Sequence, residues 1–316
     1  MRQCLGWDLY DETTRLARGL KPDEVIVEQK LVEGGISDIW FVRNPCDNRG
    51  FVLKYSREPS FENPYLFGQF ERERQCSDYI HRYDSHPIMP CIYDGGIDEK
   101  GCCYLYESFF YGIGLDEILD LPWTWKKMRV LISWIVKVME RFHRLGVVHR
   151  DIKPSNILIS RIFIDEAFKA ERKCAADNGE LVGASIRRGE KNVRFIDFSL
   201  ATIGGEAHPN HRERCAYGTP IYCSPEQALA QSVDFMSDWY SLGIAFYEWI
   251  SGCVPFRHAN VQEILLMQVQ GGVPQLVNRR IEALPEEFVE AVLWLLKKNP
   301  LERIRGIEML KSILET

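Results

Sequence analysis

The sequence predicts an α+β fold in two lobes, a small β-rich N-terminal lobe and a larger helical C-terminal lobe. Three observations lead to this prediction. Short apolar runs separated by turn residues occupy the chain from about residue 24 to about residue 107. From about residue 108 to residue 316, long segments instead carry apolar residues at intervals of three and four. A chain of 316 residues is long enough for one large domain or two modest ones.

The composition excludes several classes of protein. Hydrophobic residues make up 46% of the chain and charged residues 27%, as in an ordinary globular protein. The net charge of −6 argues against nucleic acid or an anionic membrane as the main partner. The N-terminal residues lack the apolar core of a secretory signal, and no apolar run approaches the length of a membrane span. We therefore expect a cytoplasmic protein without a membrane anchor.

The cysteines give no sign of a framework. There are ten of them, scattered along the chain, and none forms a Cys-x-x-Cys pair. A chain of this length can bury a core without cross-links. We expect reduced thiols rather than disulfides or a zinc site.

The first lobe is expected to begin after an N-terminal extension, residues 1–23, to which we assign no chemistry. Val25–Val27 precedes Leu31–Trp40, which contains the paired glycines Gly34 and Gly35, and this apolar–turn–apolar spacing predicts a β-hairpin. The elements expected next are a strand at Phe51–Tyr55, a helix from about Phe67 to Tyr83, and strands around Cys91–Tyr93 and Cys103–Glu107.

The second lobe is expected to be mainly helical. The longest amphipathic pattern runs from Trp125 to Leu145 and stops at Gly146, a common helix terminator. Ser237–Ile250 is largely apolar and predicts another helix. Further helices are expected after Val261, Glu286 and Gly306.

One charged stretch, residues 160–192, interrupts this pattern. It separates Ile157–Ile159 from Val193–Ile196, two short apolar runs that would otherwise form a hairpin. We interpret it as an insertion with a helix near Asp165–Lys173. Two interpretations remain open, a docking or regulatory element and a tolerated surface loop. On either, a short turn should replace the insertion with little loss of activity.

Eight residues, His149–Asn156, read HRDIKPSN. This pattern resembles the catalytic loop of eukaryotic-type Ser/Thr protein kinases. The resemblance implies that Asp151 accepts the proton of a substrate hydroxyl, that Asn156 binds magnesium, and that Lys153 neutralises charge on the transferring phosphoryl group. Pro154 stiffens the loop, so these side chains are placed before the substrate arrives.

The resemblance covers about nine-tenths of the chain, residues 24–316, and implies a two-lobed protein-kinase-like fold. Lys54 is similar to the family lysine that holds the α and β phosphates of ATP. The glutamate that pairs with this lysine is either Glu71 or Glu73. Glu73 is favoured because its separation along the sequence from the following His86 fits the family better.

Further residues are assigned to the nucleotide by the same resemblance. Val32–Ile39 is similar to a degenerate glycine-rich loop, whose glycines let backbone N–H groups approach phosphates. By itself this pattern also suits an ordinary hairpin turn. Tyr106–Phe109 resembles the hinge, with Tyr106 at the back of the nucleotide pocket. The implied ATP-binding residues are Val32, Gly34, Gly35, Ile39, Val52, Lys54, Glu107 and Phe109.

Asp197–Ser199 stands where the family has Asp-Phe-Gly. The resemblance implies that Asp197 binds magnesium. Serine replaces the family glycine at position 199, and serine has fewer accessible backbone angles. We expect this change to restrict switching of the motif while leaving the metal ligand intact.

Gly218–Glu226 resembles the end of a kinase activation segment. The resemblance implies that Thr219 hydrogen-bonds near Asp151 and Lys153 and takes part in catalysis, which is the pattern of Ser/Thr kinases. Two architectural contacts are also implied: Glu226 pairs with Arg303, and Asp238 braces the backbone of the catalytic loop.

Arg150 usually marks a kinase in which a phosphorylated activation-loop residue docks on the arginine. Ile203–Ala216 contains no Ser, Thr or Tyr. A carboxylate can partly replace a phosphate as the partner of an arginine. We therefore predict activity without primary phosphorylation of this loop, with Glu213, or less favourably Glu206, paired with Arg150.

The resemblance implies a Ser/Thr protein kinase that uses ATP and Mg²⁺ on protein substrates. Two alternatives are a pseudokinase that serves as a nucleotide-binding scaffold and a small-molecule phosphotransferase. Retention of Lys54, Asp151, Asn156 and Asp197 argues against the first. The Gly218–Glu226 signature argues against the second. The sequence assigns no particular substrate or oligomeric state.

Overall fold

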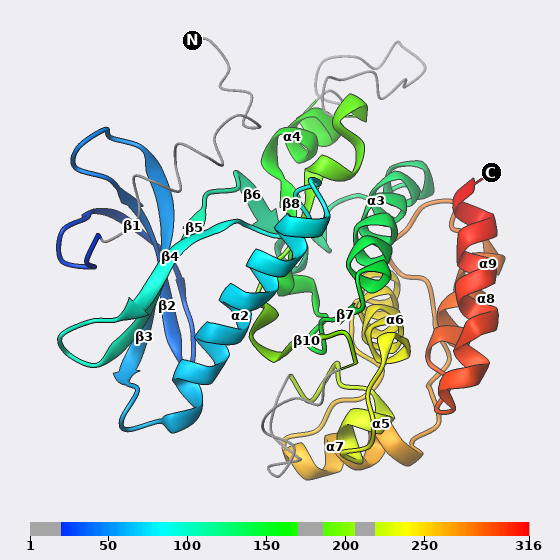
Figure 1. The fold of residues 1–316 in the computed structure, drawn as a ribbon. Coiled ribbons are helices and arrows are strands. Elements are labelled where there is room, and N and C mark those ends of the chain that lie inside the picture. The colour runs from blue at the N-terminus through cyan, green and yellow to red at the C-terminus, as the bar shows by residue number, and fades with distance from the viewer. Residues whose placement is uncertain (1–19, 170–185, 206–218, 316) are drawn as a thin grey trace. The chain divides into compact units, whose positions relative to one another are not determined.

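The computed structural model of the chain describes residues 20–169, 186–205 and 219–315 (Figure 1). The chain forms two compact units, of which the first ends at Phe110 and the second begins at Tyr111. The first holds a sheet and one long helix, and the second is mainly helical. The α+β class predicted from the sequence is therefore confirmed. In the described residues, no helix is long and apolar enough to cross a membrane.

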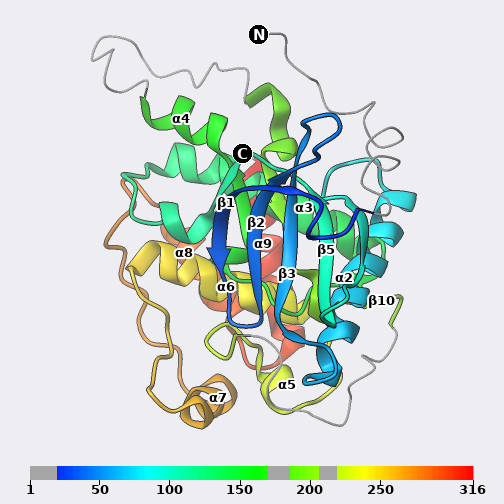
Figure 2. The same cartoon turned by 90° about the vertical axis from the view of Figure 1, so that its left-hand side faces the viewer.

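The first unit is built on a five-stranded antiparallel sheet with the strand order β1-β2-β3-β5-β4. Figure 2 shows β1, β2, β3 and β5 side by side. Apolar and aromatic residues fill these strands, whereas glycines and Asn, Asp and Ser residues mark the connections between them. The strands are β1 (Ile26–Glu33), β2 (Ser37–Arg43), β3 (Gly50–Pro59), β4 (Ile92–Ile97) and β5 (Cys102–Ser108).

Helix α2 (Pro64–Tyr83) packs against strands β4 and β5 of this sheet. It starts three residues before the predicted position because the side chain of Asn63 accepts a hydrogen bond from the backbone amide of Tyr65 and because proline suits the first helical turn. Its apolar side meets the sheet in a cluster of buried residues, Leu66, Phe70, Ile92, Cys103 and Leu105.

The opposite face of the sheet carries a second cluster, which we call the aromatic face. Its buried members are Val25, Val42, Phe51, Leu53 and Tyr106, with Trp40, Tyr55, Tyr93 and Tyr104 packed around them. The two faces separate because successive residues of a strand point to opposite sides. In β3, this alternation places Leu53 on the aromatic face and Lys54 on the face that α2 covers.

The second unit has α6 (Phe235–Ser251) at its centre. Nearly every side chain of this helix is buried, which explains why its sequence is apolar on all sides. Helix α3 (Trp125–Arg144) ends as predicted near Gly146, whose φ of 74° favours glycine. The other helices are α4 (Arg161–Lys169), α5 (Pro225–Ala228), α7 (Val261–Gln270), α8 (Glu286–Leu295) and α9 (Arg303–Glu315).

Short strands in the second unit position the loops of interest. These are β6 (Gly112–Gly114), β7 (Val147–Val148), β8 (Ile157–Ser160), β9 (Val193–Phe195) and β10 (Thr202–Ile203). The predicted hairpin on either side of the charged stretch is present, because β8 and β9 pair antiparallel with Ile157 opposite Phe195. Strand β6 extends this pair to three strands, and β10 pairs with β7.

The first part of the charged stretch corrects our interpretation of it. Helix α4 begins at Arg161, before the predicted Asp165, and the side chains of Phe163 and Ala167 are buried. The ring of Phe163 meets that of Trp134 edge to face with centroids 4.9 Å apart. Residues 161–169 are therefore part of the core and not a surface loop. Ile186–Asn192, at the other end of the stretch, forms a 3₁₀ segment that leads into β9. Residues 170–185 lie outside the described residues, so that part of the insertion remains a prediction.

Candidate active site

In the first unit, Lys54 of β3 forms a buried ion pair with Glu73 of α2. The Lys54 Nζ and Glu73 Oε2 atoms are 2.7 Å apart, and the two side chains are only 10% and 4% exposed. Glu71, the other residue that the sequence allowed, instead accepts a hydrogen bond of 2.9 Å from the guanidinium of Arg74. The structure thus places Glu73 beside the lysine. Burial strengthens the attraction and fixes the ammonium group in position.

Several proposed nucleotide-binding residues share the face of the sheet that carries Lys54. Ile39 lies opposite Lys54 in the β2–β3 register, and Val52 lies opposite Glu107 in the β3–β5 register. Directly opposed residues in an antiparallel sheet point to the same side. Val32, opposite Ile39, continues this face onto β1. Sequence and register therefore bring these side chains together as a short apolar surface beside the ammonium group of Lys54.

The turn between β1 and β2 has one glycine that the backbone requires. The amide of Gly34 donates a hydrogen bond of 3.1 Å to the carbonyl of Ser37. A Cβ atom at Gly34 would lie 2.4 Å from that carbonyl oxygen, whereas one at Gly35 would have no neighbour within 4 Å. Gly34 is therefore needed for the turn itself, and Gly35 is open to approach by a ligand.

Phe109 lies at the end of the first unit, after β5. Its ring packs against that of Phe41 with centroids 4.7 Å apart, and 42% of the residue remains exposed. Phe41 is opposite Val52 in the register, so Phe109 borders the same face as Val52. An exposed aromatic ring beside an apolar strand suits contact with a flat ligand ring.

The expected position of Tyr106 is wrong. Tyr106 lies opposite Leu53 and packs on the aromatic face, edge to face with Phe51 at 5.1 Å. Leu105, one residue earlier, lies opposite Lys54 and takes the place that we expected for Tyr106. A shift of one residue moves a strand side chain to the other side of the sheet. Both residues are apolar enough to be buried, so the sequence alone did not distinguish them.

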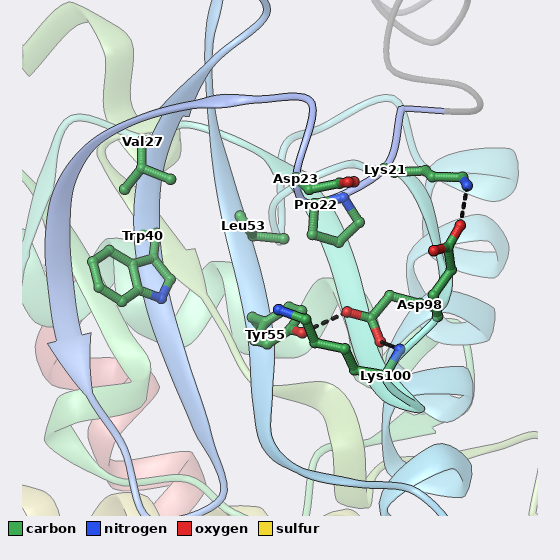
Figure 3. Close-up of a pocket in the computed structure, with 10 residues that line it drawn as sticks. Lys21, Pro22, Asp23, Val27, Trp40, Leu53, Tyr55, Asp98 and Lys100 are labelled. Atoms are coloured by element: carbon green, nitrogen blue, oxygen red, sulfur yellow. Dashed lines mark hydrogen bonds and ion pairs between the residues drawn. The ribbon is translucent and has the colours of Figure 1, made fainter.

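The aromatic face also carries a cavity of about 360 Å³ (Figure 3). Trp40 and Leu53 form its apolar wall, and the phenol of Tyr55 donates a hydrogen bond of 2.5 Å to Asp98 at its edge. The cavity is on the side of the sheet away from Lys54, as the register shows. It is therefore separate from the proposed nucleotide-binding residues.

In the second unit, the catalytic loop runs between β7 and β8 and includes a short turn of 3₁₀ helix, Pro154–Asn156. Asp238 of the central helix α6 holds its beginning. The Asp238 carboxylate accepts hydrogen bonds from the backbone amides of His149, at 2.9 Å, and Arg150, at 2.8 Å. Arg150 has a φ of 69°, a conformation that non-glycine residues rarely adopt. The expected bracing role of Asp238 matches this geometry.

Asp151 lies at the centre of a compact hydrogen-bond network. One carboxylate oxygen accepts a hydrogen bond of 2.9 Å from the amide of Thr219. The other accepts one of 3.0 Å from the side-chain amide of Asn156 and lies 3.0 Å from the Lys153 ammonium group. Lys153 also donates to the Thr219 hydroxyl at 2.9 Å. The structure thus brings together four residues that the sequence assigned to catalysis or metal binding.

Asp197 follows β9 and has a φ of 64°. The segment that carries it is tied to the catalytic loop, because the amide of Ile196 donates to the carbonyl of Asn156 at 3.0 Å. The ring of Phe198 lies 4.4 Å from that of His149, which joins the same two segments through an aromatic contact. These contacts keep Asp197 in a fixed relation to Asn156.

Ser199 has a contact that sequence reasoning missed. Its hydroxyl donates a hydrogen bond of 2.7 Å to the Asp197 carboxylate. Residues Phe198–Leu200 form a turn of 3₁₀ helix, a conformation that serine adopts without strain. The close Asp-x-Ser spacing was the available signal, because it leaves a hydroxyl near the carboxylate along the chain. Serine at this position therefore orients the carboxylate.

Away from Asp151, Glu226 and Arg303 form the predicted ion pair. The two guanidinium nitrogens lie 2.7 and 2.9 Å from the two carboxylate oxygens, and the Ser237 hydroxyl donates to the same carboxylate at 2.5 Å. Burial acts to raise the pKa of Glu226, but the hydrogen bonds and charge of Arg303 outweigh it and leave this pKa below the usual value.

Glu213 and Glu206, the partners that we predicted for Arg150, lie outside the described residues, as does Gly218. In the part of the chain that the structure describes, the buried Nε atom of Arg150 has no hydrogen-bond partner. Burial lowers the pKa of this arginine, and the nearby Asp238 only partly offsets the effect. Activity without phosphorylation of this segment stays a prediction.

Comparison with known proteins places this geometry in a family. The protein kinase domain family matches residues 25–314. The chain is 26% identical over 296 residues to the serine/threonine-protein kinase pkn3 of Myxococcus xanthus, which covers 92% of this chain and 49% of pkn3. It is 28% identical over 276 residues to the serine/threonine-protein kinase PknB of Mycobacterium tuberculosis, covering 85% of this chain and 39% of PknB. The chain thus spans about half or less of the length of these relatives. It belongs to the protein kinase domain family.

Proposed function

We propose that the chain is an active Ser/Thr protein kinase that transfers the γ-phosphoryl group of ATP to a protein hydroxyl. The observation that carries this proposal is the network around Asp151. A carboxylate that accepts hydrogen bonds from Thr219 and Asn156 is held in one orientation, which suits a group that must receive a proton at a defined atom. The similarity to relatives named as serine/threonine-protein kinases supports the same reaction.

The residues present fit a magnesium ion. The Asn156 side-chain nitrogen donates to both the carbonyl and the carboxylate of Asp151, so the amide oxygen is directed elsewhere and is available as a ligand. The Asp197 carboxylate would supply a second oxygen ligand. Magnesium prefers oxygen ligands and is often held by one or two protein groups together with phosphates and water. When bound, it would neutralise charge on the phosphates of ATP.

The chain's own residues have defined roles in the proposed reaction. Asp151 accepts the proton of the substrate hydroxyl as the oxygen attacks phosphorus. Lys153, held by Asp151 and Thr219, balances negative charge on the group in transfer. Lys54, fixed by Glu73, binds the α and β phosphates. Ile39 and Val52 contact the adenine, and backbone groups at Glu107 and Phe109 bind its edge.

The two alternatives make different predictions. A pseudokinase scaffold would bind nucleotide without turnover, but the residues expected to react are all present with satisfied contacts. A small-molecule phosphotransferase would not need Thr219 bonded to Asp151 or the buried Glu226–Arg303 pair. We also propose that the protein acts in the cytoplasm on protein substrates, without nucleic acid or membrane as a partner.

The deciding experiment measures phosphate transfer by the purified chain. MgATP is supplied with a generic protein substrate in one assay and with small-molecule acceptors in another. We expect phosphoserine or phosphothreonine on the protein, and transfer by the Asp151→Asn variant that is slower by roughly 10²–10⁴. Nucleotide binding without turnover would support the pseudokinase, and transfer to small molecules alone would support the phosphotransferase.

A further inference from the structure

A cysteine and a histidine that the proposed reaction does not use lie in contact in the first unit. Cys91 immediately precedes β4, and His81 is in the last turn of α2. The Cys91 Sγ and His81 Nε2 atoms are 3.0 Å apart. Both residues are partly exposed, so a small reagent can reach the sulfur.

The second ring nitrogen of His81 fixes the tautomer. Nδ1 lies 2.8 Å from the backbone carbonyl oxygen of Ser77, one helical turn earlier. A carbonyl oxygen only accepts hydrogen bonds, so Nδ1 carries a proton and donates it. Nε2 therefore either accepts the proton of the Cys91 thiol or, once protonated, donates to the thiolate. In both states a single proton lies between Sγ and Nε2.

The position of His81 in its helix favours the charged state of this pair. The C-terminal end of a helix carries unpaired carbonyl groups and stabilises a positive charge nearby. His81 and Arg82 are the basic residues of the last turn of α2. An imidazolium at His81 would hold Cys91 as a thiolate, which is the nucleophilic form of cysteine.

We propose that Cys91 is a modification site for peroxides and small electrophiles, with His81 as its proton acceptor. In the reaction with hydrogen peroxide, the thiolate sulfur attacks one oxygen and the O–O bond breaks. The leaving hydroxide takes the proton from the His81 imidazolium and departs as water. The sulfur is oxidised to a sulfenic acid and the peroxide is reduced.

Four other cysteines in the part of the chain that the structure describes lack this combination of access and a base. Burial raises the pKa of Cys103 to about 11 and that of Cys223 to about 12, so both are protonated at neutral pH. Cys46 and Cys253 are exposed. In the described parts of the chain, neither of these exposed thiols has a histidine within hydrogen-bond distance. They provide internal controls for access without activation.

The surroundings of Cys91 connect it to α2. The backbone amide of Ile92, the next residue, donates to the Ser77 hydroxyl at 3.0 Å. Ser77 lies one turn after Glu73 on the same helix, and Glu73 pairs with Lys54. Oxidation turns the thiolate into a neutral sulfenic acid and so removes the charged partner of the His81 imidazole at the end of α2. We infer that modification shifts α2 and weakens the Lys54–Glu73 pair.

The modification itself is tested without nucleotide. The full chain is treated with hydrogen peroxide and a sulfenic-acid trap, and each cysteine peptide is followed by mass spectrometry. We expect Cys91 to be trapped at least about tenfold faster than Cys46 or Cys253. His81→Gln should remove this advantage, whereas His86→Gln, a histidine just beyond the end of α2, should not.

Trapping of Cys91 at the rate of Cys46, or an unchanged rate in His81→Gln, would overturn the proposal. If His81→Gln does not fold, the comparison of Cys91 with Cys46 and Cys253 within the wild-type chain still decides. A circular-dichroism spectrum of each variant shows whether it is folded.

The effect on α2 is tested separately and rests on the proposed function. The affinity for MgATP is measured before and after peroxide treatment, in the wild type and in Cys91→Ser. We expect oxidation to weaken binding about threefold or more in the wild type and to leave Cys91→Ser unchanged. Equal affinity of oxidised and untreated wild type would refute the connection to α2. A chain that binds no MgATP before treatment would refute the proposed function and leave the trapping result intact.

Discussion

The carboxylate of Asp238 holds the backbone of Arg150 in a conformation that arginine rarely adopts, through a hydrogen bond of 2.8 Å from the Arg150 amide. Asp238 is fully buried, and it also lies 2.8 Å from the Nε2 atom of His143. A buried carboxylate with three such contacts both fixes the catalytic loop and depends on it, because each unmatched contact is costly in the core.

We predict that Asp238→Asn lowers the free energy of unfolding by about 2–4 kcal/mol, because an amide NH₂ would then face backbone N–H donors. Urea denaturation measures the loss. Asp234→Asn is the matched control, since Asp234 caps α6 and asparagine caps helices equally well. Equal stability of the two variants would show that the loop does not depend on this carboxylate.

Substitution of Asp151 should separate turnover from binding. We predict that Asp151→Asn reduces turnover by roughly 10²–10⁴ and leaves nucleotide affinity nearly intact, because the lost function is proton acceptance. Asp197→Ala should instead abolish the magnesium-dependent part of ATP binding. Steady-state kinetics and calorimetric titration distinguish the two effects. Full activity of Asp151→Asn would mean that the catalytic loop has been misassigned.

Loss of the Ser199 hydroxyl should remove one of the contacts that orient the Asp197 carboxylate. We predict that Ser199→Ala lowers the affinity for magnesium in the presence of ATP by a few-fold, because one hydrogen bond is worth about 1 kcal/mol. Ser199→Gly removes the same hydroxyl and adds backbone freedom, so its effect should be at least as large. Titration of magnesium at fixed ATP gives both values. Wild-type affinity in the alanine variant would show that the hydroxyl does not orient the metal ligand.

Helix α4 should be essential where the rest of the insertion is not. We predict that Phe163→Ala costs about 3–5 kcal/mol, because a fully buried ring leaves a cavity. Ile162→Ala, at a neighbouring residue that is 38% exposed, should cost less than about 1 kcal/mol. Replacement of residues 170–185 by a short glycine-containing linker should keep activity within a few-fold. Denaturation and kinase assays test the three changes, and a dead linker variant would contradict the last expectation.

Stability should respond to acid through Glu226. Its pKa is lower in the folded chain than in the unfolded chain, so folding favours the charged form. The resulting stability is fully present above the unfolded glutamate pKa of about 4.3 and is lost as pH falls through the lower, folded value. The advantage of wild type over Glu226→Gln in the free energy of unfolding should therefore shrink in acid. An advantage that does not change between pH 6 and pH 3 would refute this.

The spacing of residues within short motifs predicted most of the candidate site. Asp151, Lys153 and Asn156 lie within one loop, so their order along the chain nearly determines their proximity. The spacing does not choose between Glu71 and Glu73. Residues two positions apart on a helix point in almost opposite directions, and both residues are charged. Only the packing of α2 against the sheet decides which of them meets Lys54.

The errors have a common origin in packing. For Tyr106, the register of β5 decides which of two neighbouring buried residues faces Lys54, and the sequence of one strand does not contain its register. For α4, the many charged residues suggested a surface segment. Phe163 and Ala167 are four residues apart, which places both on one side of the helix. The hydrogen bonds of Thr219 to Asp151 and Lys153 match the expectation, although Thr219 is far from both in sequence, because a recognisable motif surrounds it.

The alternation along β3 has a consequence for assembly of the sheet. If β3 slipped by one residue, the ammonium group of Lys54 would enter the aromatic face beside Trp40 and Tyr106 and would lose its partner Glu73. Burying an unpaired charge there would cost several kcal/mol. The lysine proposed to hold ATP therefore also makes a misregistered sheet less stable. Its replacement by an apolar residue would remove this penalty as well as a phosphate contact.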